Sequence, residues 1–80
     1  MKVFIIGVGL IGGSLAKDLK SIGDFQLTGI DKNKLNLNFA LKDGIIDRLG
    51  KINEINKANI IILSVDVESA VDLLPKILTL

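Results

Sequence analysis

Two short apolar runs rich in β-branched residues stand out along the chain, over residues 3–6 and 60–65. Runs of this length are typical of strands buried on both faces, as in a parallel sheet. Residues 26–30 predict another strand, and residues 45–48 predict a short one before the second run. The hydrophobic pattern therefore indicates four strands, separated by segments with a different period.

The segment after the first strand carries apolar residues at helical spacing. Four of them would share one face of a helix: Ile11, Leu15, Leu19 and Ile22. Gly23 would end this helix as a C′ residue. Because Lys17 and Lys20 fall on other faces, we expect the apolar stripe to pack on the sheet.

Two further helices are expected. Residues 31–42 predict the first, closed by Gly44, although the alternation over residues 35–39 also fits a strand. A helix is preferred there because it completes an alternating β-α order. Asp66 would cap the last helix, which Pro75 would end or kink.

The elements thus alternate between strand and helix, with a helical turn expected over residues 52–57. This order predicts an α/β fold, a parallel sheet with helices on both faces. Right-handed crossovers would arrange the strands in the order 3-2-1-4. The fourth strand would then form an edge, where its continuous isoleucine run is unusual. We therefore expect the fold to be truncated, with residues 1–80 forming only its first part.

The composition narrows the classes of function. A formal net charge of +1, with no Trp or Tyr, argues against nucleic acid and anionic membranes as partners. The chain has no Cys and no His, which excludes thiolate metal sites, Cys nucleophiles and histidine as a base or metal ligand. No other residue is a convincing acid, base or nucleophile, so we expect no catalytic residue and no metal site in it. No stretch approaches the roughly 20 apolar residues of a membrane span, so a cytoplasmic location is expected.

The segment between the first strand and the first helix is rich in glycine. Gly7, Gly9 and Gly12 form a G-x-G-x-x-G pattern, and Asp31 follows Gly12 by 19 residues at the end of the next strand. Gly7 would permit a tight turn, Gly9 would let a pyrophosphate approach the backbone, and Gly12 would let the helix pack closely. In this context the pattern predicts the N-terminal part of a dinucleotide-binding Rossmann domain.

The same pattern predicts how a cofactor would be held. The backbone N–H groups of Leu10 and Ile11 would face the phosphates at the start of the helix. Asp31 would accept hydrogen bonds from both adenosine ribose hydroxyls and repel a 2′-phosphate, which favours NAD over NADP. Lys32 would weaken that preference. Asp31 could also be the N-cap of the second helix, and the glycines could merely form a turn in a protein that binds no ligand.

Three residues follow the fourth strand, at the edge of the sheet where ligands of such folds bind: Ser64, Val65 and Asp66. They could line the path to the nicotinamide ribose, or serve only as a strand-end hydroxyl and a helix cap. Three other acids are interpreted as ordinary solvated charges: Asp43, Asp47 and Glu54. Three aromatic residues are expected in the core: Phe4, Phe25 and Phe39.

Beyond the general glycine pattern, the run G-L-I-G-G-S-L-A over residues 9–16 resembles the opening of the prephenate and arogenate dehydrogenases of tyrosine biosynthesis. Residues 28–33, 40–47 and 58–65 resemble their second-strand end, their A-x-x-x-G-x-x-D stretch and their fourth strand. The resemblance covers essentially the whole chain. One departure is Asp66, where members of the family usually have proline.

The resemblance implies that NAD takes a hydride from the hydroxyl-bearing ring carbon of prephenate, with loss of carbon dioxide and formation of 4-hydroxyphenylpyruvate. It also implies a histidine on a later segment that takes the hydroxyl proton. A helical C-terminal domain, absent here, would complete the substrate pocket and a homodimer. The fragment alone is therefore expected to be inactive.

Three alternatives remain open from the sequence. The chain could be the cofactor domain of another NAD(P)-dependent dehydrogenase. It could be a regulatory nucleotide-sensing Rossmann module, although such modules usually lack the G-G-S-L-A run. It could also be a Rossmann-like scaffold that binds nothing.

Overall fold

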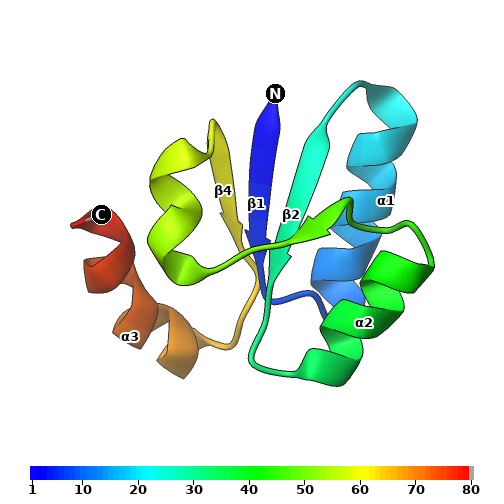
Figure 1. Cartoon of the computed structure of the whole chain (residues 1–80). Coiled ribbons are helices and arrows are strands. Elements are labelled where there is room, and N and C mark those ends of the chain that lie inside the picture. Colours follow the sequence, from blue (N-terminus) through cyan, green and yellow to red (C-terminus); the bar gives the residue numbers. More distant parts are fainter. Residues whose placement is uncertain (80) are drawn as a thin grey trace.

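A four-stranded parallel sheet forms the centre of the computed structural model, which describes residues 1–79 and, for Leu10 and Ile11, only the backbone (Figure 1). The elements are, in chain order, β1 (Lys2–Ile6), α1 (Leu10–Ile22), β2 (Gln26–Ile30), α2 (Lys34–Lys42), β3 (Arg48–Leu49), the 3₁₀ helix η1 (Ile52–Lys57), β4 (Ile60–Leu63) and α3 (Val67–Leu78). The sheet order is β3-β2-β1-β4, which confirms the predicted order 3-2-1-4.

The register of the sheet brings three strand ends to the same level. Ile6, the last residue of β1, pairs with Ile30 of β2 on one side and with Leu63 of β4 on the other. The segments that follow these three strands therefore meet at the carboxyl edge of the sheet, where ligands bind in open α/β folds.

Successive residues of β1 point to opposite faces of the sheet, so they build two separate cores. Val3 and Ile5 join a cluster with residues of α1 and α2, and Phe4 and Ile6 join another with Ile55 of η1. Figure 1 shows α1 and α2 on one side of the sheet and η1 and α3 on the other. The expected burial of β1 on both faces is confirmed, since residues 3–6 are all buried.

The buried face of α1 differs in part from the predicted stripe, of which Leu19 does pack against the core. Gly12 and Ala16 face the sheet, whereas Leu15 is partly exposed and Ile22 is 75% exposed. At Gly12, α1 lies too close to the loop after β1 for a larger residue: a Cβ there would lie 2.0 Å from the Gly7 carbonyl oxygen. The helix does end before Gly23, but that glycine is extended (φ 178°) rather than left-handed.

The second helix and third strand begin later than predicted. Asn33, not Asp31, caps α2, since its side chain accepts from the N–H groups of the first turn. Gly44 follows the helix with a φ of +71°, in the left-handed region. Ile45 and Ile46 are not in a strand, because both of their N–H groups donate to the Ala40 carbonyl at the end of α2.

One expectation about the aromatic side chains is wrong, and one of the two alternatives for Pro75, an end of the helix, is excluded. Phe39 is not in the core but 63% exposed, beside a hollow between α1 and α2. Phe4 is buried as expected, and Phe25 is partly buried. Pro75 does not end α3, which continues to Leu78. The predicted N-cap of this helix, Asp66, is confirmed.

β4 forms an edge of the sheet, as expected, and much apolar surface lies near it. Ile60 and Ile61 are each more than a third exposed. Four apolar residues at helical spacing on α3 are also exposed: Val67, Val71, Leu74 and Leu78. Within residues 1–79, no helix is long and apolar enough to cross a membrane.

Candidate cofactor-binding site

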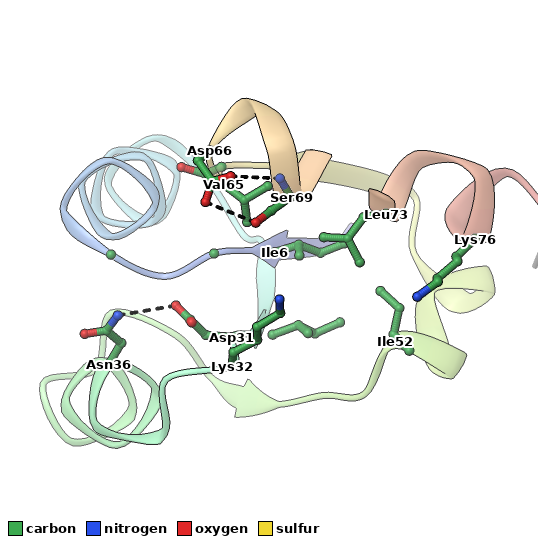
Figure 2. Close-up of a pocket in the computed structure, with 14 residues that line it drawn as sticks. Ile6, Asp31, Lys32, Asn36, Ile52, Val65, Asp66, Ser69, Leu73 and Lys76 are labelled. Carbon is green, nitrogen blue, oxygen red and sulfur yellow. Dashed lines mark hydrogen bonds between the residues drawn. The ribbon is translucent and has the colours of Figure 1, made fainter. Parts of the chain in front are cut away.

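A cavity of about 570 Å³ opens at the carboxyl edge of the sheet, between the turn after β2 and helix α3 (Figure 2). Its volume is in the usual range for small-molecule sites. It brings together seven of the predicted site residues: Gly7, Gly9, Asp31, Lys32, Ser64, Val65 and Asp66. Gly12 lies in the first turn of α1 and does not line the cavity. The side chains of Leu10 and Ile11 lie outside the described part of the chain.

Gly7 makes the turn out of β1 in a conformation that favours glycine. Its φ is +94°, and a Cβ there would lie 2.2 Å from the Ser64 carbonyl oxygen. Its N–H continues the sheet by donating to the Ile30 carbonyl oxygen at 2.7 Å. The turn is therefore tight because the segment after β4 lies directly against it.

Gly9 differs from Gly7 and Gly12 because nothing in the fold requires glycine at its position. Its φ is −84°, and a Cβ there would have no atom within 4 Å. It is the N-cap of α1 and has no side chain to bond the first N–H groups of the helix. Those N–H groups and the helix dipole attract anions. The open space beside Gly9 therefore fits a phosphate group close to the start of α1.

Asp31 lies at the end of β2 with both carboxylate oxygens hydrogen-bonded. Oδ2 accepts from the Val8 N–H at 2.8 Å, and Oδ1 accepts from the Asn33 N–H at 2.9 Å. The Asn36 side chain approaches Oδ2 at 3.5 Å, as Figure 2 shows. A carboxylate has about four acceptor sites, so Asp31 retains capacity for further hydrogen bonds from a ligand.

Asp66 is the N-cap of α3, and its carboxylate is hydrogen-bonded to that helix. It accepts from the Ser69 N–H at 2.8 Å and from the Ser69 hydroxyl at 3.0 Å. The hydrogen bonds from the Ser69 backbone and hydroxyl lower the pKa of the Asp66 carboxyl, and the positive charge of Lys32 adds to this effect. The carboxylate is thus stabilised by its own helix instead of standing free in the cavity.

Seven further residues that the sequence did not indicate as site residues line the cavity: Ile6, Ile30, Asn36, Ile52, Ser69, Leu73 and Lys76. Three of them come from α3, and with Asp66 they occupy positions 66, 69, 73 and 76 on one face of that helix. This spacing was visible in the sequence, but nothing there indicated that the face turns toward the glycine-rich loop. In Figure 2, Lys76 and Ile52 close the end of the cavity opposite Asn36 and Asp31.

The wall of the cavity is partly apolar, and its negative side chains are hydrogen-bonded within the fold while its positive ones form no ion pairs with described residues. Ile30, Ile52 and Leu73 form part of the apolar wall. Both carboxylates are hydrogen-bonded to backbone N–H groups, whereas Lys32 and Lys76 form no ion pair with any described residue. The arrangement suits an anionic ligand with a flat apolar portion.

Asp47 is not the ordinary solvated charge that was expected. Its Oδ2 accepts from the Leu27 N–H at 2.8 Å, and its Oδ1 pairs with the Lys20 ammonium at 2.6 Å. Burial by itself would raise the pKa of Asp47, but the Leu27 N–H and Lys20 together hold it below its usual value. Glu54 is likewise engaged, with Arg48 and with the Lys51 N–H. These acids stabilise the fold and lie away from the cavity.

Comparison with known proteins gave related dehydrogenases. No protein-family model matches the chain. It is 39% identical to the prephenate dehydrogenase of Lactococcus lactis subsp. cremoris, over 98% of this chain and 22% of that protein. It superposes on Synechocystis arogenate dehydrogenase with a TM-score of 0.88 and 30% identity, over 99% of this chain and 28% of that one.

It also superposes on the prephenate dehydrogenase of A. aeolicus, crystallised with hydroxyphenyl propionate and NAD+, with a TM-score of 0.82 and 31% identity. That match covers 91% of this chain and 27% of the other. The chain therefore spans about a quarter of the length of these relatives. Over nearly its whole length, this chain is homologous to the prephenate and arogenate dehydrogenases, and its parallel sheet matches their NAD-binding domain.

Proposed function

We propose that this chain forms the NAD-binding part of a prephenate dehydrogenase, which oxidatively decarboxylates prephenate to 4-hydroxyphenylpyruvate in tyrosine biosynthesis. The observation that carries the proposal is the open position beside Gly9, at the start of α1 and in the same cavity as Asp31. A relative with 31% identity was crystallised with NAD+ and hydroxyphenyl propionate, which supports this ligand. Arogenate is the second candidate substrate, because the Synechocystis relative is an arogenate dehydrogenase.

In this proposal the pyrophosphate of NAD lies at the start of α1. Gly7 makes the turn, Gly9 leaves room for the pyrophosphate, and the backbone N–H groups of Leu10 and Ile11 donate to its oxygens. Gly12 contributes indirectly, because it lets α1 begin close to the turn. The positive end of the helix dipole favours the negative charge there.

The adenosine extends from the pyrophosphate across the cavity. Asp31 accepts hydrogen bonds from the ribose hydroxyls, and Lys32 lies beside the ribose. Ile52 and Leu73 provide apolar surface for the adenine ring. Toward the other end of the cofactor, the segment formed by Ser64, Val65 and Asp66 borders the nicotinamide ribose. Bound NAD+ supplies the hydride acceptor of the reaction.

The remaining parts of the reaction require groups that the chain does not contain. It has no histidine or cysteine, so the proton acceptor for the substrate hydroxyl belongs to another part of the protein. We propose that residues 1–80 are the first part of a dinucleotide-binding domain. The rest of the protein would supply the remainder of this domain and a helical domain that completes the substrate pocket and a homodimer.

Titration of the chain with NAD+ and with NADP+, followed by amide NMR shifts, tests the proposal. We expect saturable shifts around Gly7, Gly9 and Asp31, with NAD+ binding more tightly than NADP+ because Asp31 repels a 2′-phosphate. Tighter or equal binding of NADP+ would refute the cofactor assignment. Shifts confined to the hollow between α1 and α2 would refute the site. Assays of the full-length protein with prephenate and arogenate, followed by NADH absorbance, distinguish the two substrates.

A further inference from the structure

One carboxylate joins three segments of the chain at the mouth of the cavity. Asp31 is the residue immediately after β2, and its Oδ2 accepts from the Val8 N–H in the loop between β1 and α1. Its Oδ1 accepts from the N–H of Asn33, the residue that caps α2. Contact with the ribose of a ligand requires neither of these bonds.

The Val8 side chain is buried in the core, but the backbone of this loop has few hydrogen bonds to fix its course. Val8 lies between two glycines, which have more backbone freedom than any other residue. The Gly7 N–H is bonded to the Ile30 carbonyl oxygen, and the next N–H, that of Val8, is bonded to Asp31. Two consecutive N–H groups therefore attach the loop to the end of β2. The second of them depends on a side chain, and the backbone of Gly9 follows directly.

We propose that Asp31 is a positioning residue for the pyrophosphate-binding loop, in addition to its role toward the ribose. Its carboxylate fixes the Val8 peptide, which sets the course of the backbone through Gly9 and the direction of the first N–H groups of α1. The identity of the ligand as NAD rests on the proposed function. The ordering of the loop by Asp31 does not depend on it. Asp31 would thus couple binding of the ribose to the position of the backbone N–H groups that bind the phosphates.

The two roles of Asp31 predict opposite results for a diphosphate that lacks ribose hydroxyls. If Asp31 acts only through the ribose, its removal leaves the affinity for such a ligand unchanged or raises it, because a nearby negative charge is lost. If Asp31 orders the loop, its removal lowers that affinity, because the loop must be ordered when the ligand binds.

The test measures the affinity of the chain for ADP and for 2′,3′-dideoxy-ADP, which lacks the ribose hydroxyls but keeps the adenine and both phosphates. We expect Asp31→Ala to weaken binding of 2′,3′-dideoxy-ADP about fivefold, at the lower end of typical coupling between sites. Asp24→Ala is the matched control, because it removes the same charge from an exposed residue with no side-chain hydrogen bond to the described residues. This control should bind both nucleotides as the unchanged chain does.

Amide hydrogen exchange of Val8 without any ligand provides a second readout. We expect faster exchange in Asp31→Ala and an unchanged rate in Asp24→Ala. Should the alanine variant fail to fold, Asp31→Asn serves in its place. It has one acceptor oxygen for two N–H groups, so the amide of Val8 or of Asn33 must exchange faster.

Unchanged exchange at these amides, or unchanged affinity of Asp31→Ala for 2′,3′-dideoxy-ADP, overturns the positioning role. A chain that binds neither NAD+ nor ADP overturns the proposed function instead, and the exchange measurement still decides whether Asp31 orders the loop. The two ideas can therefore fail separately.

Discussion

Gly9 and Gly12 lie three residues apart, yet adding one methyl group to each should have different effects. In Gly12→Ala the new Cβ would lie 2.0 Å from the Gly7 carbonyl oxygen, a backbone atom that cannot rotate away. Carbon atoms prefer separations of about 3.5 Å or more from their neighbours, so α1 or the loop must shift by more than 1 Å. Overpacking of this kind costs about 1–3 kcal/mol, more than the roughly 1 kcal/mol that alanine gains over glycine in a helix.

In Gly9→Ala the new Cβ meets no atom within 4 Å. The folded state should lose at most about 1 kcal/mol, because alanine is a poorer N-cap. Binding should suffer far more, since the methyl group takes the space assigned to the pyrophosphate. We expect the affinity for NAD+ to fall at least about tenfold, equivalent to 1.4 kcal/mol.

Thermal unfolding by circular dichroism and NAD+ binding by calorimetry measure the two effects separately. One kcal/mol shifts the unfolding midpoint of a domain of this size by about 4–8 °C, so a loss at Gly12 is measurable. Gly13→Ala is the control, because its Cβ position is also open but does not line the large cavity. Equal loss of stability in Gly9→Ala and Gly12→Ala, with unchanged NAD+ affinity in Gly9→Ala, would refute the division of roles.

Three other predictions concern stability, association and activity. The folded pKa of Asp47 is lowered, so its stabilising effect is present above its ordinary value of 3.8 and is lost as the pH falls through the folded value. Asp47→Asn should therefore unfold at a lower temperature than the unchanged chain at pH 7, and the difference should shrink below about pH 4; a constant difference contradicts this. The unpaired edge of β4 should promote self-association of this 80-residue chain as its concentration rises. Ile61→Lys should reduce it in sedimentation experiments, and a strictly monomeric chain would contradict the expectation. The chain should oxidise no prephenate, because it has no histidine; NADH formation by the pure chain would contradict this.

The sequence predicts the parts of the fold that depend on local pattern. The apolar runs of β1 and β4, the alternating element order and the sheet order all follow from periodicity and crossover handedness. The buried face of α1 does not follow from periodicity, because Gly12 and Ala16 face the sheet, and at Gly12 a larger residue would collide with the loop. Ile45 and Ile46 likewise have strand-like composition, but the end of α2 holds their N–H groups.

The residues of the candidate site also differ in whether local sequence pattern reveals them. Gly7, Gly9 and Asp31 are recognisable because their spacing is fixed by one strand-turn-helix unit and the next strand. Leu73 and Lys76 cannot be recognised in this way, because they reach the cavity only when α3 packs on the sheet. The bond between Asp31 and the Val8 N–H also joins residues 23 positions apart, and no local pattern reports such a contact.

The different caps of α1 and α3 make the two helix starts electrostatically unequal. Both helices begin near the same cavity, and each begins with a partial positive charge of about half an elementary unit. At α3 the Asp66 carboxylate compensates that charge, whereas at α1 the cap is Gly9, which compensates nothing. A linear diphosphate entering the cavity thus meets one attractive pole and one neutralised pole. Charge at the helix starts alone therefore favours an anionic group beside Gly9 over one beside Asp66.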